Sequence, residues 1–204
     1  MSEAVATHAE AYEAPLTPES WGKLGMWVFL AGDAMSFGTL LAGYGAVRFG
    51  SGDWPNPQEN LGIELSGAMT LLLIVSSVFM VKGLSAVRHD DQPGFRKWIG
   101  LTIAGGLLFV LIQFLWEWPH FIHKGIGFAS NPFGSSLFGT TLYVITGFHG
   151  MHVTGGVIYL ACILLRGWNG HYNSQNFNAV EIAGLYWHFV DLVWIMVFTF
   201  IYML

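Results

Sequence analysis

Five long apolar runs divide the chain, and short polar segments rich in Gly, Pro or charged residues separate them. Each run is as long as the roughly 20 residues that an α-helix needs to cross the hydrocarbon core of a bilayer. The runs cover residues 21–49, 61–87, 98–118, 137–165 and 179–204. Backbone groups inside a bilayer must hydrogen-bond within their own segment, which favours helices. The pattern predicts an all-α integral membrane bundle of five transmembrane helices, forming a single domain over residues 21–204.

The composition also indicates a membrane protein, because 53% of the residues are hydrophobic and 10% are charged. Soluble domains carry about 25% charged residues. The formal net charge of −5 provides no basic surface for nucleic acid. Four glutamates make residues 1–20 acidic, and we expect a mobile acidic N-terminal tail there. The start of the sequence does not show the basic segment, short apolar core and cleavage site of a signal peptide, so we predict none.

The positions of Lys and Arg predict the orientation in the membrane. Six of them fall on the side of the membrane that holds the N-terminus, namely Lys23, Lys82, Arg88, Arg96, Lys97 and Arg166. Arg48 and Lys124 fall on the other side. Positively charged loops are enriched on the cytoplasmic side. We therefore expect a cytoplasmic N-terminus and a periplasmic C-terminus, in a bacterial inner membrane.

Asp33 lies near the centre of the first apolar run, where a carboxylate costs several kcal/mol unless it is paired, hydrated or protonated. Two interpretations stay open: a proton-handling or lipid-sensing acid, or a carboxyl group that hydrogen-bonds to a neighbouring helix or subunit. Ala34, Gly38, Ala42 and Ala46 recur every four residues beside it. Such a stripe of small residues predicts close packing against another helix.

Glu117 lies near the outer end of the third run and is followed by Trp118, Pro119, His120 and His123. Proline is expected to end or kink the helix at this point. Trp and His at the end of a span commonly mark the membrane interface, so a structural role is favoured for Glu117. Two histidines without further ligands are weak grounds for a metal site.

The fourth run carries His149 and His152, which are three residues apart and therefore share a helix face. Thr146, Gly150 and Thr154 form a second stripe of small residues on the same run. Imidazole groups do not face lipid tails cheaply, and small residues let a neighbouring backbone approach closely. Both patterns predict that the fourth helix lies inside the bundle.

The fifth run has a polar stripe formed by Glu181, Gly184, His188 and Asp191 at helical spacing. His188 and Asp191 are close enough to interact directly or through one water. The fourth and fifth runs are antiparallel neighbours, so their histidines could meet this stripe. A proton relay or a cofactor site is one interpretation. An interhelical network that fixes helix packing is the one we favour.

Two other classes of protein stay open at this point. His152 and His188 lie about one helical turn apart in depth, so they could hold a b-type haem between two helices. Asp33 with the His188–Asp191 pair could serve a proton or solute transporter. The sequence shows no internal repeat and no pair of broken helices, which weakens the transporter hypothesis.

Residues 146–156, read as Thr-Gly-Phe-His-Gly-Met-His-Val-Thr-Gly-Gly, resemble the signature of subunit III of haem–copper terminal oxidases, the cytochrome c oxidase subunit 3 family. Residues 186–194 resemble that family near its C-terminus, and residues 25–37 resemble its first conserved helix. Glu117 followed by Trp118 resembles a family Glu followed by an aromatic residue. The resemblance extends over residues 21–204, and rare intramembrane residues at fixed spacings make the longer motifs specific.

The resemblance implies a five-helix, non-catalytic subunit III of a proton-pumping oxidase that reduces oxygen to water in aerobic respiration. It implies no catalytic residue, haem, copper or other metal on this chain, with haem and copper on partner subunits. Oxidase subunits I and II and bound phospholipid are the expected partners, and a larger respiratory supercomplex is a further option. Packing, lipid binding and support of proton uptake would then be the roles of Asp33, Glu117, His149, His152, Glu181, His188 and Asp191.

The sequence departs from the family pattern at two places. Asp33 stands where the family usually has Glu, so its carboxyl group is one methylene closer to the backbone. Gln113 lies four residues before Glu117, whereas a family Gln is often three before, and its role is not carried over. Whether cytochrome c or quinol donates the electrons stays open. An accessory subunit of a nitric oxide reductase is the closest alternative function.

Overall fold

The computed structural model describes residues 18–204, and the predicted acidic tail lies outside them except for residues 18–20. Five long helices make up most of the chain: α1 (Pro18–Gly50), α3 (Ile63–Arg88), α4 (Gln92–Ile112), α6 (Leu137–Trp168) and α7 (Asn178–Val197). The shorter segments are α2 (Pro57–Asn60), α5 (Trp118–His123) and the π-helical η1 (Gln113–Glu117) and η2 (Phe198–Met203).

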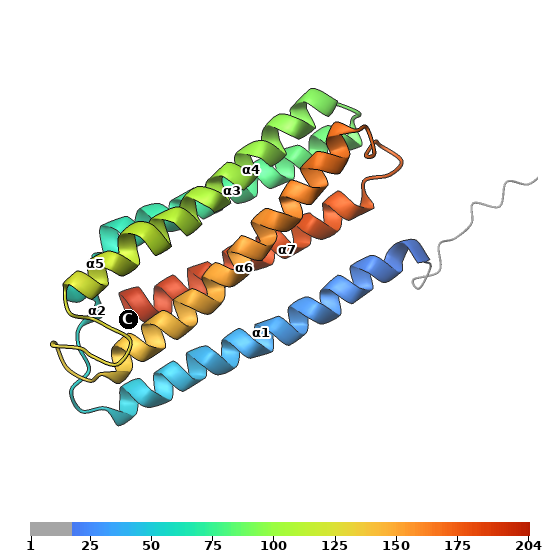
Figure 1. The fold of residues 1–204 in the computed structure, drawn as a ribbon. Coiled ribbons are helices and arrows are strands. Elements are labelled where there is room, and N and C mark those ends of the chain that lie inside the picture. Colours follow the sequence, from blue (N-terminus) through green and yellow to red (C-terminus); the bar gives the residue numbers. More distant parts are fainter. Residues whose placement is uncertain (1–17) are drawn as a thin grey trace, which may run out of the picture.

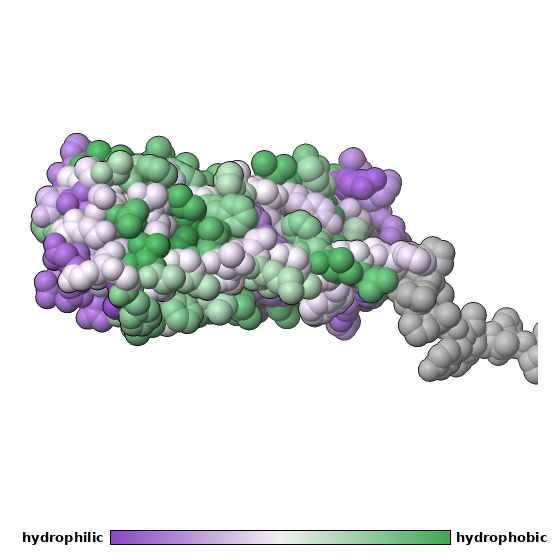
Figure 2. Space-filling view, turned by 90° about the horizontal axis from the view of Figure 1, so that it is seen from below, coloured by the Kyte–Doolittle hydropathy of each residue, from purple (hydrophilic) through white to green (hydrophobic). Residues whose placement is uncertain are grey.

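Five helical segments of the described part of the chain are long and apolar enough to cross a membrane. They are Trp21–Gly50, Ile63–Arg88, Gln92–His123, Leu137–Trp168 and Asn178–Met203. In Figure 2 hydrophobic residues occupy much of the middle of the visible face, while hydrophilic residues gather toward the two ends. The predicted all-α bundle of five transmembrane helices is confirmed, and the chain is an integral membrane protein.

The third span differs most from its predicted bounds. It begins at Gln92 rather than near residue 98, because the Asp91 side chain caps the helix by accepting from the Gly94 backbone N–H at 3.0 Å. Pro119 does not end the helix, which continues to His123. The π-helical turn of η1 comes directly before α5, and a wider turn leaves room for a proline ring that would clash in an α-helix.

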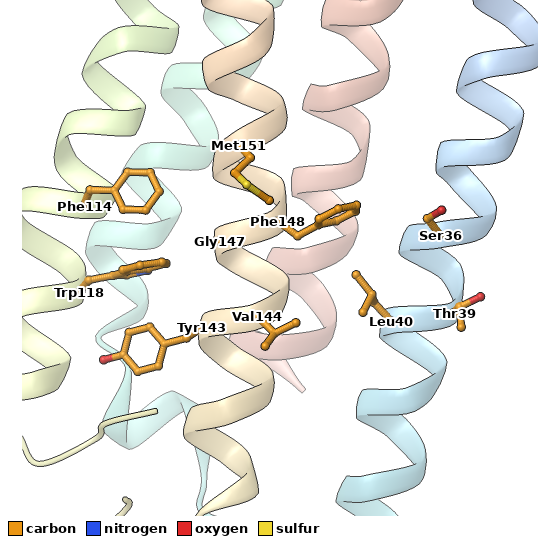
Figure 3. A pocket seen from close by; sticks show the side chains of 10 residues that line it. All are labelled: Ser36, Thr39, Leu40, Phe114, Trp118, Tyr143, Val144, Gly147, Phe148 and Met151. Carbon is orange, nitrogen blue, oxygen red and sulfur yellow. The ribbon is translucent and has the colours of Figure 1, made fainter. Parts of the chain in front are cut away.

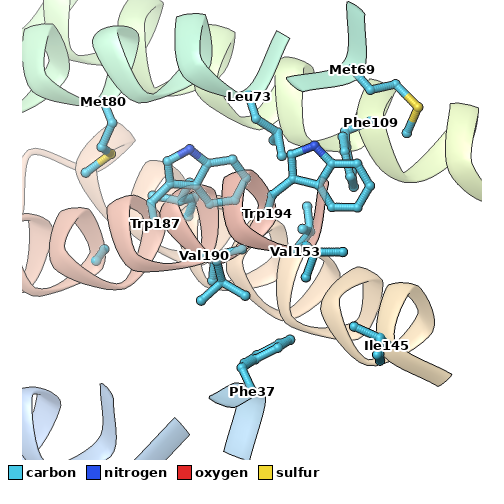
Figure 4. Packing of buried hydrophobic residues seen from close by; sticks show 14 of the residues in the cluster. Phe37, Met69, Leu73, Met80, Phe109, Ile145, Val153, Trp187, Val190 and Trp194 are labelled. Atoms are coloured by element: carbon cyan, nitrogen blue, oxygen red, sulfur yellow. The ribbon is translucent and has the colours of Figure 1, made fainter. Parts of the chain in front are cut away.

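Helices α3, α4, α6 and α7 form a ring in which each helix contacts two of the others, and α1 lies outside it against α6 and α7 (Figure 1). The hydrophobic core lies inside the ring. Trp187 and Trp194 of α7 point into it between α3 and α4 (Figure 4). Gly156 makes room for the first of these rings, since a Cβ there would lie 3.0 Å from Trp187.

Helix α1 packs less tightly than the rest, because only 17% of its most apolar stretch is buried, against 44% for the span that contains α7. Leu30, Phe37 and Tyr44 are the large residues that it turns toward the bundle. The predicted packing stripe of small residues on this helix does not pack against another helix in the described part of this chain. Ala34, Gly38, Ala42 and Ala46 are all exposed, because larger side chains take the inward positions.

Candidate functional site

Asp33 and His152 form an ion pair that joins α1 to α6. The Asp33 carboxylate is 9% exposed, and its Oδ1 lies 3.1 Å from Nε2 of His152. Nδ1 of the same imidazole lies 2.7 Å from the backbone carbonyl of Phe148. A carbonyl only accepts hydrogen bonds, so Nδ1 carries a proton. The contact between Nε2 and Asp33 then needs a second proton, which the carboxyl and imidazole groups share.

This arrangement disfavours the haem hypothesis. An axial ligand to haem iron needs a ring nitrogen that is free to bind the metal. Both ring nitrogens of His152 are engaged, one by Phe148 and the other by Asp33. His188 points its Nδ1 at the Ser77 hydroxyl of α3, at 2.5 Å. That contact leaves Nε2 of His188 available, but a bis-histidine haem needs both residues, and His152 has no free nitrogen to offer.

Three members of the polar stripe of α7 face α3. His188 contacts Ser77, and the Ser77 hydroxyl also interacts with the Asp191 carboxyl group. Gly184 packs against Met80, also of α3. Sequence analysis left open a contact between this stripe and the histidines of the fourth span, whereas the structure turns the stripe toward α3. Ser77 was missed, although a hydroxyl inside an apolar run was a usable signal for an interhelical bond.

Glu181 lies at the cytoplasmic end predicted for the bundle and belongs to a separate cluster of charges. Its carboxylate pairs with Lys23 of α1 at 2.8 Å and with Arg88 of α3 at 3.3 Å. The Arg88 guanidinium also lies 4.9 Å from the centre of the Phe177 ring. One acidic side chain of α7 thus connects three helices.

His149 lies only three residues from His152 but has different surroundings. It is fully buried, and its ring lies 4.9 Å from the centre of the Trp194 ring and 5.7 Å from that of Phe109. Neither ring nitrogen has a hydrogen-bond partner among the described residues. Gly150 next to it meets Gln113, whereas Thr154 is exposed, so the predicted small-residue stripe packs only in part.

Glu117 lies near the end of the third span and is buried, with 1% of its surface exposed. The Ser66 hydroxyl of α3 donates to its Oε1 at 2.8 Å. Gln113, at the other end of η1, donates to the Thr146 carbonyl at 2.8 Å. Ser66 was missed as a site residue, and Gln113 was named in the sequence analysis without a role. His120 and the nearby His123 are exposed, and the described residues hold no cluster of three or more metal-binding side chains.

Two apolar grooves flank α1. The larger has a volume of about 750 Å³ and lies between α1 on one side and α6 with the end of the third span on the other (Figure 3). Its lining comprises Ser36, Thr39, Leu40, Phe114, Trp118, Tyr143, Val144, Gly147, Phe148 and Met151. The second, about 420 Å³, lies between α1 and α7 and includes Trp27, Leu30 and His188. Hydropathy alone did not predict either groove.

Outside the membrane-spanning segments, Asp90 ties the α3–α4 turn to the loop that precedes α7. Its backbone φ of 56° is left-handed, a conformation that Asp tolerates better than most residues. The backbone N–H of Ser174 donates to the Asp90 carboxylate at 2.7 Å. This hydrogen bond holds the pKa of the carboxyl group below its ordinary value.

Comparison with known proteins gives a consistent result. The family described as cytochrome c oxidase subunit III matches residues 23–204. The chain is 38% identical over 182 residues to a cytochrome c oxidase subunit 3 from Synechocystis sp., covering 88% of this chain and 74% of that one. It is 37% identical over 182 residues to the protein of that name from Thermostichus vulcanus, covering 89% and 86%. A probable cytochrome c oxidase subunit 3 from Mycobacterium tuberculosis is 37% identical over 180 residues, covering 88% and 86%.

Proposed function

Since the chain belongs to the cytochrome c oxidase subunit III family and is a subunit of a haem–copper oxidase, we propose that it supports the catalytic subunit without making or breaking bonds itself. The complex reduces oxygen to water in aerobic respiration. Subunits I and II are the proposed neighbours, and a bacterial inner membrane is the proposed location. The relatives' names favour this function over an accessory subunit of a nitric oxide reductase.

The observation that carries the proposal is the Asp33–His152 pair. Asp33 is buried and His152 is partly buried at mid-span, and the two share a proton across the contact between α1 and α6. Such a group can release or accept a proton without leaving an isolated charge in the membrane, because the partner compensates for it. We assign Asp33 and His152 to the support of proton uptake by subunit I.

Helix packing is the role assigned to the other polar residues. His188 and Asp191 meet Ser77, and Glu181 joins Lys23 and Arg88. Each of these contacts crosses between helices, which is what a network that fixes helix register requires. His149 and Glu117 are assigned to packing within the ring of four helices, where both are buried.

The larger groove beside α1 supports the lipid-binding part of the proposal. Its walls are almost entirely apolar, and they include Leu40, Val144, Phe148 and Met151. An acyl chain fits a groove of this chemistry, because it replaces contacts with bulk lipid by contacts with fixed side chains. The pair formed by Asp33 and His152 lies next to the groove along α1 and α6, so a bound phospholipid would lie beside the proton-sharing groups.

Haem and copper are assigned to the partner subunits and would supply the oxygen chemistry there. The orientation is likewise a proposal: Lys23, Arg88 and Arg166 gather at one end of the bundle, which we place in the cytoplasm. The C-terminus then lies on the periplasmic side.

Purification through this chain in mild detergent tests the proposal. We expect subunits I and II to co-purify and the complex to show the reduced-minus-oxidised spectrum of its haems. Deleting the chain should leave that spectrum nearly unchanged while the enzyme loses activity after fewer turnovers. A b-type haem spectrum from the isolated chain, or oxidase that keeps its full working life without it, would contradict the proposal.

A further inference from the structure

Glu117 is a second buried intramembrane acid, and it has none of the partners that Asp33 has. It ends the π-helical segment η1, and only the Ser66 hydroxyl donates a hydrogen bond to it, at Oε1. The second oxygen, Oε2, has no hydrogen-bond partner among the described residues. The Tyr202 hydroxyl of η2 lies close to the same carboxyl group. Hydroxyl groups, rather than cations, therefore surround it.

No positive charge faces Glu117 within the part of the chain that the structure describes. The ion pairs found there involve Glu181 and Asp33 instead. The titratable groups that face it are Tyr202 and, from α6, Tyr143, whose hydroxyl donates to the Ile126 carbonyl at 2.8 Å. A charged carboxylate without a cation in an apolar interior costs several kcal/mol. The neutral acid is the form that these surroundings favour.

A pocket leads from the surface of the molecule to this acid. It has a volume of about 230 Å³ and lies where α2 and α5 meet the start of α3. Glu117 lines it, together with His120 and Glu64, which are both exposed. A water molecule takes up about 30 Å³ in the liquid, so the pocket holds several. Glu64 and His120 supply the hydrogen-bond partners that such waters need, and Glu117, with 1% of its surface exposed, lies in the wall behind them.

We propose that Glu117 is a protonated acid that exchanges its proton with water at the end of the bundle that carries α2 and α5. In this step the O–H bond of the carboxyl group breaks, and the proton passes to a water in the pocket and then to His120 or to bulk water. The hydroxyl groups of Ser66 and Tyr202 stabilise the carboxylate that remains. The reverse transfer restores the neutral acid, so the site stores and returns one proton.

This site is distinct from the Asp33–His152 pair. Asp33 lies on α1 and finds its proton partner on α6, whereas Glu117 lies inside the ring of four helices and opens to the α2–α5 end. The Glu181 ion-pair cluster lies at the opposite end of the bundle (Figure 1). The chain therefore holds two intramembrane acids in different surroundings. An experiment can contradict the proposal for one of them and leave the proposal for the other intact.

Infrared difference spectroscopy on the purified oxidase complex tests the proposal. A neutral carboxylic acid has a C=O stretching band well above the carboxylate bands, and Glu117→Gln should remove one such band. Transfer to D₂O should shift the same band in the wild-type complex as fast as solvent is exchanged. His120→Trp, at the mouth of the pocket, should slow that shift several-fold. Glu59→Gln is the matched control, because Glu59 on α2 is exposed and does not line the pocket, and it should leave the band in place.

Ser66→Ala provides a second readout if the Glu117→Gln complex does not assemble. Loss of the Ser66 hydrogen bond should move the C=O band to higher frequency without removing it. The proposal is overturned if the wild-type complex has no acid band that responds to either substitution, because Glu117 is then ionised. A band that responds but does not shift in D₂O also overturns it, because the acid then has no access to water.

Discussion

The ring of four helices and helix α1 are held together by different kinds of contact. Large side chains fill the ring, among them the fully buried Trp187, Trp194 and Phe109. Helix α1 buries far less of its surface and is joined to the ring by polar contacts along its length. These contacts are Lys23 with Glu181, Asp33 with His152, and Arg48 with the Leu204 backbone carbonyl.

The difference follows from the solvent that surrounds the protein. Lipid tails are as apolar as a leucine side chain, so apolar contact alone gives a helix little reason to leave lipid for protein. Among the four helices, close packing of aromatic side chains favours contact with protein over contact with lipid. Gly156, for example, lets Trp187 approach the backbone of α6. A peripheral helix with small exposed residues lacks such packing. Directional polar contacts then fix its position, and grooves remain on both of its sides.

The largest effect is expected from Trp187→Ala, because the indole that it deletes is fully buried among helices α3, α4, α6 and α7. Removing a buried Trp costs about 3–5 kcal/mol, since it loses contacts and leaves a cavity. We expect the thermal inactivation temperature of the complex to fall and its yield to drop. Trp27→Ala on α1 is the matched control, since Trp27 is 58% exposed and should cost far less. Equal losses of stability in the two variants would contradict the claim that α1 is packed less tightly than the other four long helices.

The contact between Asp33 and His152 should have the next largest effect. A double-mutant cycle with Asp33→Asn and His152→Gln isolates the coupling between the two side chains. Interhelical hydrogen bonds in membranes contribute about 0.6 kcal/mol on average and about 1.7 kcal/mol at most. A proton-sharing pair that is largely shielded from solvent should lie near the upper value, measured by the detergent concentration at which the complex dissociates. Zero coupling would show that α1 is placed by other contacts.

The Glu181 cluster should contribute less, because its side chains are partly exposed. Exposed ion pairs contribute about 0–1 kcal/mol and weaken as salt screens them. We expect Lys23→Met to lower the stability of the complex slightly at low salt and to have no effect at high salt. Lys82→Met is the matched control, since Lys82 lies on a Trp98 ring rather than in an ion pair. A salt-independent loss in the Lys23 variant would contradict this assignment.

The smallest effect concerns Asp90, at the surface between two loops. The Ser174 hydrogen bond depresses the pKa of the folded-state carboxyl group, so its stabilising contribution is present above the ordinary pKa of Asp, about 4. That contribution is lost as the pH falls through the depressed pKa. Amide hydrogen exchange at Ser174, corrected for the intrinsic rate, should therefore rise at low pH.

Asp90→Asn provides the control for this experiment, because Asn tolerates the left-handed backbone and still offers an oxygen acceptor. Protection of the Ser174 amide should be independent of pH in that variant. Identical pH dependence in both proteins would show that the Asp90 carboxylate does not control this contact.

Hydropathy predicted the helices because it depends on short stretches of sequence. The five spans, the all-α fold and the family could all be recognised from residues 21–204 alone. The bounds of the third span could not be recognised from hydropathy. The Asp91 cap starts the helix at Gln92, and the π-helical segment η1 lets it continue beyond Pro119. Both effects depend on backbone geometry that a hydropathy pattern does not contain.

The sequence did not predict which polar side chains of different helices contact each other. The cost of burying Asp33 predicted that it needs a partner, but the choice of His152 depends on how α1 and α6 are rotated against each other. The same rotation turns Gly38 and the rest of the predicted packing stripe away from the other helices of this chain. Ser66 and Ser77 were overlooked because a hydroxyl in an apolar run looks neutral until an acid or imidazole faces it.

The most direct test of the account counts the turnovers that the purified oxidase completes before it loses activity. Asp33→Asn removes the shared proton, and Asp33→Glu restores the residue that is usual in the family, with a matched carboxyl group. We predict that the Asn variant inactivates after fewer turnovers with an unchanged haem spectrum, while the Glu variant keeps the wild-type lifetime. Equal lifetimes for the wild-type and Asn complexes would contradict the claim that this pair supports the working oxidase.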